Sequence, residues 1–297
     1  MFSVNRINNL DNSLQEIMLV NGTKRISAKI NLACGGSLQE FIFGGKTIIS
    51  DLRSIGYSDL YASSVLFPFV NRIKDGKYTY KVKQYQLEKN EGTNAQHGLV
   101  YHKLFRLVES AESASSASVT LAYQEKNYVA GFPFLYALYL TYTLTEDGII
   151  LKAVIKNEDE KTFPFNVGWH PYFYSSNLKE SQLKIDSIQK LTFDTEMIAT
   201  GLEGHFQKKP LLIGEKYFDD CFQLSNGNIV FKTPEYSLSL SSNAESNYLQ
   251  VYTPKIKNIL AIEPLTGPPN SFNSKKDLQI LKPGEAYSVT WKIKISL

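Results

Sequence analysis

The stretch FPFLYALYLTYTL, residues 132–144, decides the fold class. Every second residue in it is large and apolar, and the residues that share this face are Phe134, Tyr136, Leu138, Leu140, Tyr142 and Leu144. Because side chains alternate between the two faces of a strand, the stretch is predicted to be a strand with one face in a core. The turn EDG at 146–148 leads into IILKAVIKN at 149–157, which alternates in the same way. The two stretches are therefore predicted to form a β-hairpin.

The same alternation recurs elsewhere in the chain. It is found in YSLSLSS at 236–242 and in residues 288–297, which follow the turn KPGE at 282–285. KDG at 74–76 and SNGN at 225–228 predict further turns. Helical periodicity is weak, and the best candidate, residues 48–66, is interrupted by Gly56 and several serines. The pattern predicts an all-β fold, specifically a large antiparallel β-sandwich.

Composition supports this prediction. The chain has 18 Tyr and 17 Phe, residue types that favour half-buried pleated surfaces. Its 297 residues permit one large domain or two modest ones. No internal repeat or long linker divides the chain, and the polar stretch ESAESASSAS at 109–118 is interpreted as a surface turn.

Charge and cysteine usage exclude several classes of protein. The 32 basic and 29 acidic residues form no block of one sign, so a nucleic-acid partner is not expected. The stretch YTYKVKQYQ at 78–86 is interpreted as a strand with a solvated lysine edge, not as a base-stacking platform. Cys34 and Cys221 are expected to be free thiols because two cysteines make no disulfide framework in a chain of this length.

The pattern of apolar residues bears on localisation. The first residues lack the basic segment and apolar core of a signal peptide. The longest uncharged stretch, residues 129–144, is too short to span a bilayer. We therefore expect a soluble, cytoplasmic protein with no membrane partner.

His170 is the first candidate for chemistry. It lies in NVGWHPYF at 166–173, where its neighbours indicate at least partial burial. A buried histidine bonded to the backbone and a functional acid or base explain this position equally well. Trp169, Tyr172 and Phe173 could line such a site, although packing in the core is the expected role of at least two of them.

Glu263 is the second candidate, on the same side of a predicted strand as Ile259 and Ala261, with Pro264 expected to end that strand. A carboxylate in apolar surroundings needs a function or a cationic partner. Desolvation would raise its pKa and make it a better base.

Three further positions complete the candidate set. Arg72 follows an apolar run, and its guanidinium suits a carboxylate or a ligand rich in hydroxyls. His97 precedes Gly98, which permits close approach of another backbone. Asp219 and Asp220 are adjacent, so at most one faces a given pocket.

Two histidines are expected on the surface, His102 and His205. His97 and His102 are five residues apart and face opposite sides of a strand, so no metal site is expected. The chain lacks GxSxG, HExxH, Walker and GxGxxG motifs. A glycosidase built from Glu263 and one aspartate stays possible.

Five motifs in order resemble the aldose 1-epimerase (galactose mutarotase-like) family. They are YASSVLFPFVNRIKDGKYTY at 61–80, KNEGTNAQHGLVYHKLF at 89–105, NVGWHPYF at 166–173, FDDCF at 218–222 and LAIEPLTGPPNSFN at 260–273. The resemblance extends from about residue 30 to the last strand. It implies one domain over residues 1–297, a β-sandwich of the galactose mutarotase type, and a reaction on a reducing sugar that needs no cofactor and no metal.

The resemblance also implies a role for each matched residue. Glu263 would be the general base that takes the proton of the anomeric hydroxyl, and His170 the general acid that protonates the ring oxygen. His97 would act beside them as a further catalytic residue. Arg72, the adjacent Asn71 and Asp219 would bind the sugar, with Asp219 chosen over Asp220 on the spacing D-x-x-F.

The identity of the sugar is left open by one departure. HPYF is not followed directly by the Asn-Leu associated with dedicated galactose mutarotases. A hexose 6-phosphate would need more cations than Arg72, and Lys74 or Lys103 could supply them. The alternatives are a hexose-6-phosphate mutarotase and a carbohydrate-binding protein without turnover. A monomer or a homodimer is expected.

Overall fold

The predicted hairpin is the centre of the computed structural model, which describes residues 1–8, 14–204 and 209–297. It consists of β13 (Tyr136–Thr145) and β14 (Gly148–Asn157), which pair from Tyr136↔Asn157 to Thr145↔Gly148. The five β13 residues of the predicted apolar face are buried, whereas the other face is half-buried apart from Ala137. The hairpin prediction is confirmed.

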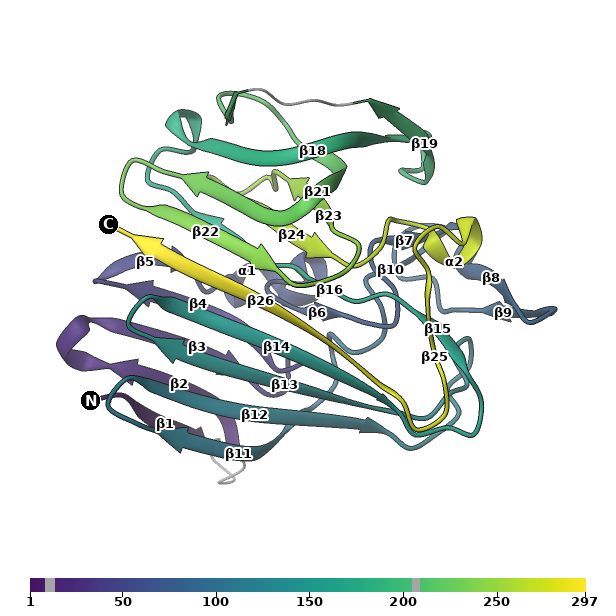
Figure 1. The fold of residues 1–297 in the computed structure, drawn as a ribbon, viewed down its shortest axis with the longest axis horizontal. Helices are drawn as coiled ribbons and strands as arrows, with labels where there is room; N and C mark the ends of the chain where they lie inside the picture. The colour runs from purple at the N-terminus through teal and green to yellow at the C-terminus, as the bar shows by residue number, and fades with distance from the viewer. Residues whose placement is uncertain (9–13, 205–208) are drawn as a thin grey trace.

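The hairpin belongs to a large antiparallel sheet that crosses the molecule (Figure 1). Its main path follows the order β11 (Arg106–Glu112), β12 (Ser116–Glu125), β13, β14, β26 (Ala286–Ser296), β22 (Ser237–Ser242), β21 (Asp219–Lys232), β23 (Tyr248–Tyr252), β24 (Ile259–Leu265), β16 (Gly168–Trp169) and β6 (Val65–Leu66). Off this path, β17 (Tyr172–Tyr174) pairs with β24, and β18 (Gln182–Phe193) pairs with β21, β19 (Ala199–Gly204) and β20 (Leu211–Leu212).

A second antiparallel sheet is built from the N-terminal part of the chain. Its strands, in order, are β1 (Ser3–Asn8), β2 (Leu14–Asn21), β3 (Ile26–Asn31), β4 (Ser37–Phe43) and β5 (Lys46–Ile49). Buried side chains of this sheet, such as Ile17 and Phe41, belong to the same hydrophobic cluster as Leu140 and Leu151 of the large sheet. Burial of both inner faces in one core is what stabilises a sandwich. The large antiparallel sandwich is confirmed.

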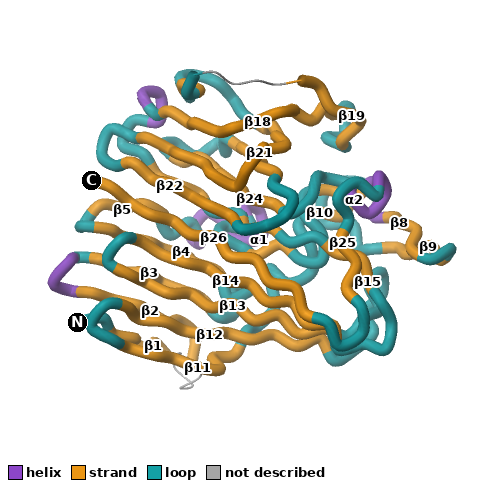
Figure 2. Tube along the Cα trace, in the orientation of Figure 1, coloured by secondary structure: helices purple, strands orange, loops and turns teal. Residues whose placement is uncertain are grey.

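Short elements fill the remaining connections (Figure 2). Three two-stranded pairs are β7 (Arg72–Ile73) with β10 (Ala95–Gln96), β8 (Lys77–Tyr80) with β9 (Lys83–Gln86), and β15 (Phe163–Phe165) with β25 (Gln279–Leu281). The helices are α1 (Arg53–Leu60) and α2 (Ser271–Ser274), with 3-10 turns η1 (Gly22–Lys24), η2 (Lys74–Gly76) and η3 (Leu178–Glu180). The helix α1 lies within the weakly helical stretch 48–66 and is interrupted at Gly56, where φ is 114°.

Three local predictions need correction. SNGN at 225–228 is not a turn but part of β21, at the point where that strand changes its partner from β23 to β22. Residues 78–86 form the hairpin β8–β9 instead of one strand, because Lys81 and Val82 adopt positive φ. Pro264 does not end its strand, since β24 continues to Leu265.

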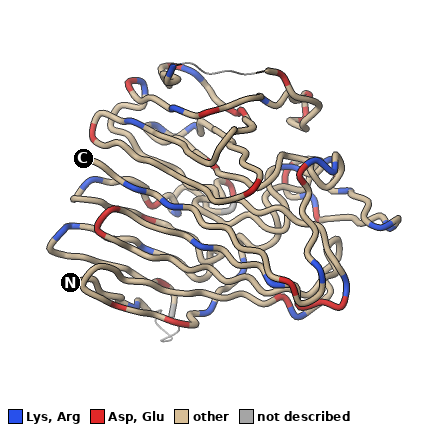
Figure 3. The backbone as a smooth tube through the Cα atoms, in the orientation of Figure 1, with Lys and Arg blue, Asp and Glu red and all other residues tan. Residues whose placement is uncertain are grey.

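Other predictions concern surface and charge. His102 is exposed as predicted, whereas His205 lies outside the described residues. Cys34 and Cys221 are free, and Cys221 is buried. Figure 3 shows Lys and Arg interspersed with Asp and Glu along the described chain. No helix of the described residues is long and apolar enough to cross a membrane.

Candidate active site

Glu263 lies in β24, a strand in which every residue is buried. Its side chain is 1% exposed, and Oε1 lies 3.3 Å from Nε2 of His170. Oε2 has no hydrogen-bond partner among the described residues. A buried carboxylate oxygen without a partner is costly, so its presence indicates a group that meets a ligand.

The backbone of His170 is fixed by hydrogen bonds to the segment 63–64. It follows β16 directly, its N–H donates to the carbonyl of Ser64 at 3.0 Å, and its own carbonyl accepts from Ser63 at 2.9 Å. Nε1 of Trp169 donates to the carbonyl of Ser63 at 3.1 Å. The imidazole approaches Glu263 through Nε2, while its Nδ1 has no partner among the described residues.

The aromatic neighbours of His170 have different positions. Trp169 packs in the core against Trp291, with ring centroids 6.2 Å apart, and Phe173 packs near Phe231. Tyr172 lines the cavity beside His170. Two of the three aromatics are core residues, as expected.

His97 approaches the pair from another segment of the chain. Its ring lies edge-on to that of His170, with centroids 4.9 Å apart, and also contacts Tyr61 at 4.7 Å. The backbone turns here with φ of 60° at His97 and 77° at Gly98. A Cβ at Gly98 would lie 2.3 Å from the carbonyl oxygen of Phe67, so glycine is required for this close approach.

Burial governs the protonation of these three groups. It lowers the pKa of His170 to about 4 and raises the pKa of Glu263 well above its ordinary value. Burial also lowers the pKa of His97 well below its ordinary value, and the nearby His170 and Arg72 add to this effect. Burial thus favours the neutral forms of all three side chains.

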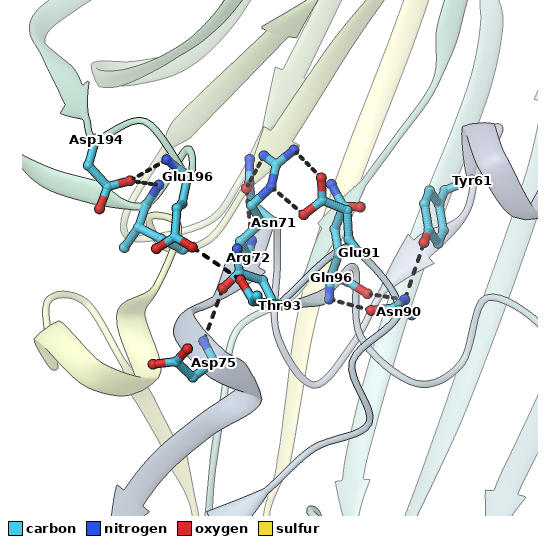
Figure 4. A network of polar contacts seen from close by, with 12 residues as sticks. Tyr61, Asn71, Arg72, Asp75, Asn90, Glu91, Thr93, Gln96, Asp194 and Glu196 are labelled. Carbon is cyan, nitrogen blue, oxygen red and sulfur yellow. Dashed lines mark hydrogen bonds and ion pairs between the residues drawn. The ribbon is translucent and has the colours of Figure 1, made fainter.

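A chain of polar contacts joins the sugar-binding candidates. Nε2 of Gln250 donates to Oδ1 of Asp219 at 2.7 Å, and its Oε1 accepts from Nδ2 of Asn71 at 3.2 Å. Oδ1 of Asn71 accepts from the backbone N–H of Arg72 at 2.8 Å. Nε and Nη2 of Arg72 donate to the two carboxylate oxygens of Glu91 at 3.1 and 3.2 Å (Figure 4). These contacts join polar groups of the three strands β21, β23 and β7 with those of Asn71 and Glu91 in the adjoining loops.

The adjacent aspartates face opposite sides, as their spacing predicts. Asp219 lines the cavity, and burial raises the pKa of its carboxyl, which Arg72 partly opposes. Asp220 pairs with Lys190 at 2.8 Å and does not line that cavity.

All six candidate residues line one cavity of about 280 Å³. Its complete lining is Asp59, Leu60, Tyr61, Asn71, Arg72, Glu91, Gln96, His97, His170, Tyr172, Tyr217, Asp219, Gln250, Tyr252 and Glu263. Sequence reasoning missed Gln250 and Glu91 above all. The stretch NYLQVY at 247–252 gave a usable signal for Gln250, since a glutamine alternates there with two tyrosines. Glu91 gave none, because an isolated glutamate in a polar loop is ordinary.

The buried triad also has the donor types of a metal site. One ligand atom from each of His97, His170 and Glu263 lies within 4.8 Å of the others. Two imidazoles and a carboxylate suit a transition metal such as Zn²⁺. The same groups suit proton transfer, for which a metal is not required.

Comparisons with known proteins show what the whole chain is similar to. The uncharacterized protein YihR of Escherichia coli is 27% identical over 97% of this chain and 96% of its own length. The aldose 1-epimerase of Streptococcus thermophilus is 26% identical over 66% of this chain and 63% of its own length. The crystal structure of a galactose mutarotase-like protein from Clostridium acetobutylicum matches with a TM-score of 0.88 at 20% identity, over 99% of this chain and 98% of that one.

The likeness of folds is thus strong even where sequence identity is low. The family model of aldose 1-epimerase matches residues 15–294, which include all six candidate residues. The chain belongs to the aldose 1-epimerase family.

Proposed function

We propose that the protein is an aldose 1-epimerase that interconverts the α and β anomers of a hexose by opening and closing the sugar ring. The observation that carries the proposal is the approach of His170 Nε2 to Glu263 Oε1, at 3.3 Å, inside a cavity. Ring opening removes a proton from one oxygen of C1 and adds a proton to the other. Both oxygens are bonded to the same carbon, so the acid and the base must lie close together.

The proposed steps conserve every proton. The Glu263 carboxylate takes the proton of the anomeric hydroxyl, the bond from C1 to the ring oxygen breaks, and protonated His170 gives its proton to that oxygen. The aldehyde then rotates about C1–C2 and presents its other face. On closure, neutral His170 accepts the proton of the attacking hydroxyl and Glu263 returns its own proton to the aldehyde oxygen.

The electrostatics of the pair suit a reversible reaction. The pair has two arrangements with the same number of protons. In the charged arrangement His170 is an imidazolium and Glu263 a carboxylate, and in the neutral arrangement His170 is an imidazole and Glu263 a carboxylic acid. Burial favours the neutral arrangement, which corresponds to the state of the two groups after ring opening. Hydrogen bonds from a bound sugar favour the charged arrangement, because they replace solvation that burial has removed. A small difference between the two arrangements allows transfer in both directions.

The other four residues orient the sugar. His97 touches the His170 ring and lines the cavity, and its Nδ1 has no hydrogen-bond partner among the described residues. Asn71 and Asp219 are joined through Gln250 and offer polar atoms to sugar hydroxyls. Arg72 supplies the positive charge that favours oxygen with developing negative charge.

The alternatives explain the site less well. A glycosidase uses two carboxyl groups that flank the bond to be cleaved, whereas here the close partner of Glu263 is a histidine. A protein that only binds a sugar has no need of a buried histidine beside a buried glutamate, and both are unfavourable for stability without a function.

The test is the relaxation of freshly dissolved α-D-glucose and α-D-galactose, followed by polarimetry. We expect the wild-type protein and the control variant His102→Asn to accelerate relaxation, because His102 is exposed and outside the cavity. His170→Asn should abolish the acceleration while the protein stays folded. Sugar binding by calorimetry without accelerated relaxation would favour a binding protein, and release of free sugar from a glycoside would favour a glycosidase.

A further inference from the structure

Arg72 and Glu91 form an ion pair in the lining of the cavity. The guanidinium is the single cationic side chain among the described residues that line the cavity, whereas Asp59, Glu91, Asp219 and Glu263 are acidic. Arg72 is 13% exposed and uses Nε and Nη2 to hold both oxygens of Glu91. Such a bidentate contact fixes geometry as well as charge. We call this pair the Arg72–Glu91 clamp.

Hydrogen bonds within the loop that carries Glu91 fix the conformation of that loop (Figure 4). Glu91 and Asn94 exchange two backbone hydrogen bonds, at 2.9 and 3.2 Å. The side chain of Asn90 accepts from the N–H of Gln96 at 2.7 Å and donates to its carbonyl at 3.0 Å. Gln96 pairs with Arg72 where β10 runs antiparallel to β7. The loop that carries Glu91 therefore leads into a strand that is hydrogen-bonded to the strand of Arg72.

A second segment supports the loop from outside. Glu196, which follows β18, accepts a hydrogen bond from Thr93 at 3.2 Å. Lys74 lies 3.9 Å from carboxylate oxygens of both Asp194 and Glu196. Glu91 is half exposed at 40%, yet its loop is held at both ends, unlike an ordinary mobile surface acid.

The cations expected for a phosphate are placed elsewhere. Lys74 pairs with the two acids after β18, and Lys103 lies over the ring of Tyr123, 5.9 Å from its centroid. Neither lines the cavity. An anionic group on the sugar would therefore meet Glu91 and have to separate it from Arg72.

We propose that Glu91 is the specificity-determining residue of this site: it positions Arg72 for neutral sugars and excludes sugars with an anionic group, such as 6-phosphates and uronic acids. This inference rests on the proposed function for its catalytic readout. Like charges placed together in a binding site cost enough binding free energy to reject a ligand. The residue that supplies the repulsion therefore determines selectivity.

The test compares substitutions of Glu91 that separate charge from geometry. Glu91→Gln removes the charge and keeps the shape, whereas Glu91→Asp keeps the charge and is too short for the bidentate contact. The charge control is Glu196→Gln, which removes an equal charge from a neighbouring segment that does not contact Arg72, while the amide oxygen can still accept the hydrogen bond from Thr93. The readouts are kcat and KM for D-glucose relaxation, the inhibition constant of D-glucose 6-phosphate against it, and calorimetric binding of D-glucose and D-glucuronate.

We expect Glu91→Gln to tighten binding of both anionic sugars at least about tenfold relative to D-glucose. Glu91→Asp should keep the exclusion, but we expect a higher KM for D-glucose because the guanidinium is less firmly held. Glu196→Gln should change the ratio of the affinities for anionic sugars and for D-glucose by less than about threefold. Thermal unfolding checks that each variant is folded.

Three results would overturn the inference. One is wild-type protein that binds D-glucuronate as tightly as D-glucose. Another is an equal shift in selectivity from Glu196→Gln and Glu91→Gln. That result would show that the selectivity comes from the overall negative potential of this surface and not from Glu91. The last is an unchanged ratio in Glu91→Gln. Calorimetry separates this inference from the proposed function, since wild-type protein that binds D-glucose without accelerating its relaxation would fail as an enzyme and could still obey the predicted selectivity.

Discussion

The hairpin β13–β14 and the strand β24 belong to the same sheet but follow different rules. Along β13, apolar side chains enter the core on one face, and the other face is half-buried. Along β24 every position is buried, and one of them is a glutamate beside a histidine. The hairpin shows how the sandwich is stabilised, whereas β24 carries a buried ionisable side chain, Glu263, whose burial is unfavourable for stability. Stability and activity should therefore respond to different substitutions.

Glu263→Gln gives the largest effect on the β24 side. We expect kcat/KM for sugar relaxation to fall about 10²–10⁴-fold, because the proposed general base is lost while the amide keeps the shape. The melting temperature should stay the same or rise, since a buried acid is replaced by a neutral group. Polarimetry and thermal unfolding measure the two quantities. A melting temperature that falls as far as that of a core deletion would contradict the division between the two regions.

Leu140→Ala is the matching change in the hairpin. Leu140 is fully buried, so we expect a loss of about 2–5 kcal/mol in the free energy of unfolding from lost burial and a cavity. The activity of the folded fraction and its KM should not change. Denaturant unfolding and relaxation assays on the same sample test this, and a large change in KM would show that the hairpin shapes the site.

The pH dependence of kcat/KM sharpens the description of the His170 and Glu263 pair. Activity needs one transferable proton on the pair. Below the lowered pKa of His170, about 4, both groups are protonated and no base remains. Above the raised pKa of Glu263 both are deprotonated and no acid remains. We expect a bell with a broad top whose acid limb falls about tenfold per pH unit. An acid limb with its midpoint near pH 6.5 would show that the pKa of His170 is that of an ordinary histidine, and would contradict the lowered value.

Asp219→Asn and Asp220→Asn form a matched pair with a smaller expected effect. Asp219 accepts from Gln250 and lines the cavity, so its loss should raise KM about tenfold. Asp220 pairs with Lys190 outside the cavity lining, and its substitution should leave KM within about twofold. Steady-state kinetics measure KM for both variants. A KM of Asp219→Asn that stays as close to the wild-type value as that of Asp220→Asn would show that Asp219 does not contact the sugar.

Thr141→Ala is the smallest change and tests the half-buried face of the hairpin. Thr141 exchanges a hydrogen bond with Thr120 of the neighbouring strand at 3.0 Å. A cross-strand pair of this kind contributes about 0.2–1 kcal/mol, so we expect a loss at the lower end of that range without an effect on activity. Denaturant unfolding measures it, and a loss as large as that of Leu140→Ala would show that this face also belongs to the core.

The two regions also differ in what the sequence alone could predict. The hairpin was predictable because alternation and a short turn are local properties. Pro264 was misread because the sequence does not reveal the partners of β24. On one side those partners pair at Tyr172–Tyr174 and at Gly168, and Pro264 lies between these two contacts, where its missing N–H breaks no pairing of that edge.

The candidate site was predictable as far as its residues were unusual in their surroundings. Glu263, His170 and Arg72 are polar residues in apolar runs, and His97 is marked by the glycine that follows it. The family resemblance supplied Asn71 and the choice of Asp219. Gln250 and Glu91 were missed because their positions depend on contacts between distant segments. Gln250 faces Glu263 across β23 and β24, and Glu91 reaches Arg72 through the pairing of β10 with β7.

The measurement that tests the central claim most directly is a double-mutant cycle on the acid and the base. Relaxation of α-D-glucose is followed for the wild-type protein, Glu263→Gln, His170→Asn and the double variant. Because the two groups act together in the proposed proton transfer, we expect each single variant to lose most of the activity and the double variant to lose little more. Losses that simply multiply in the double variant, or single variants as active as the wild type, would contradict the account.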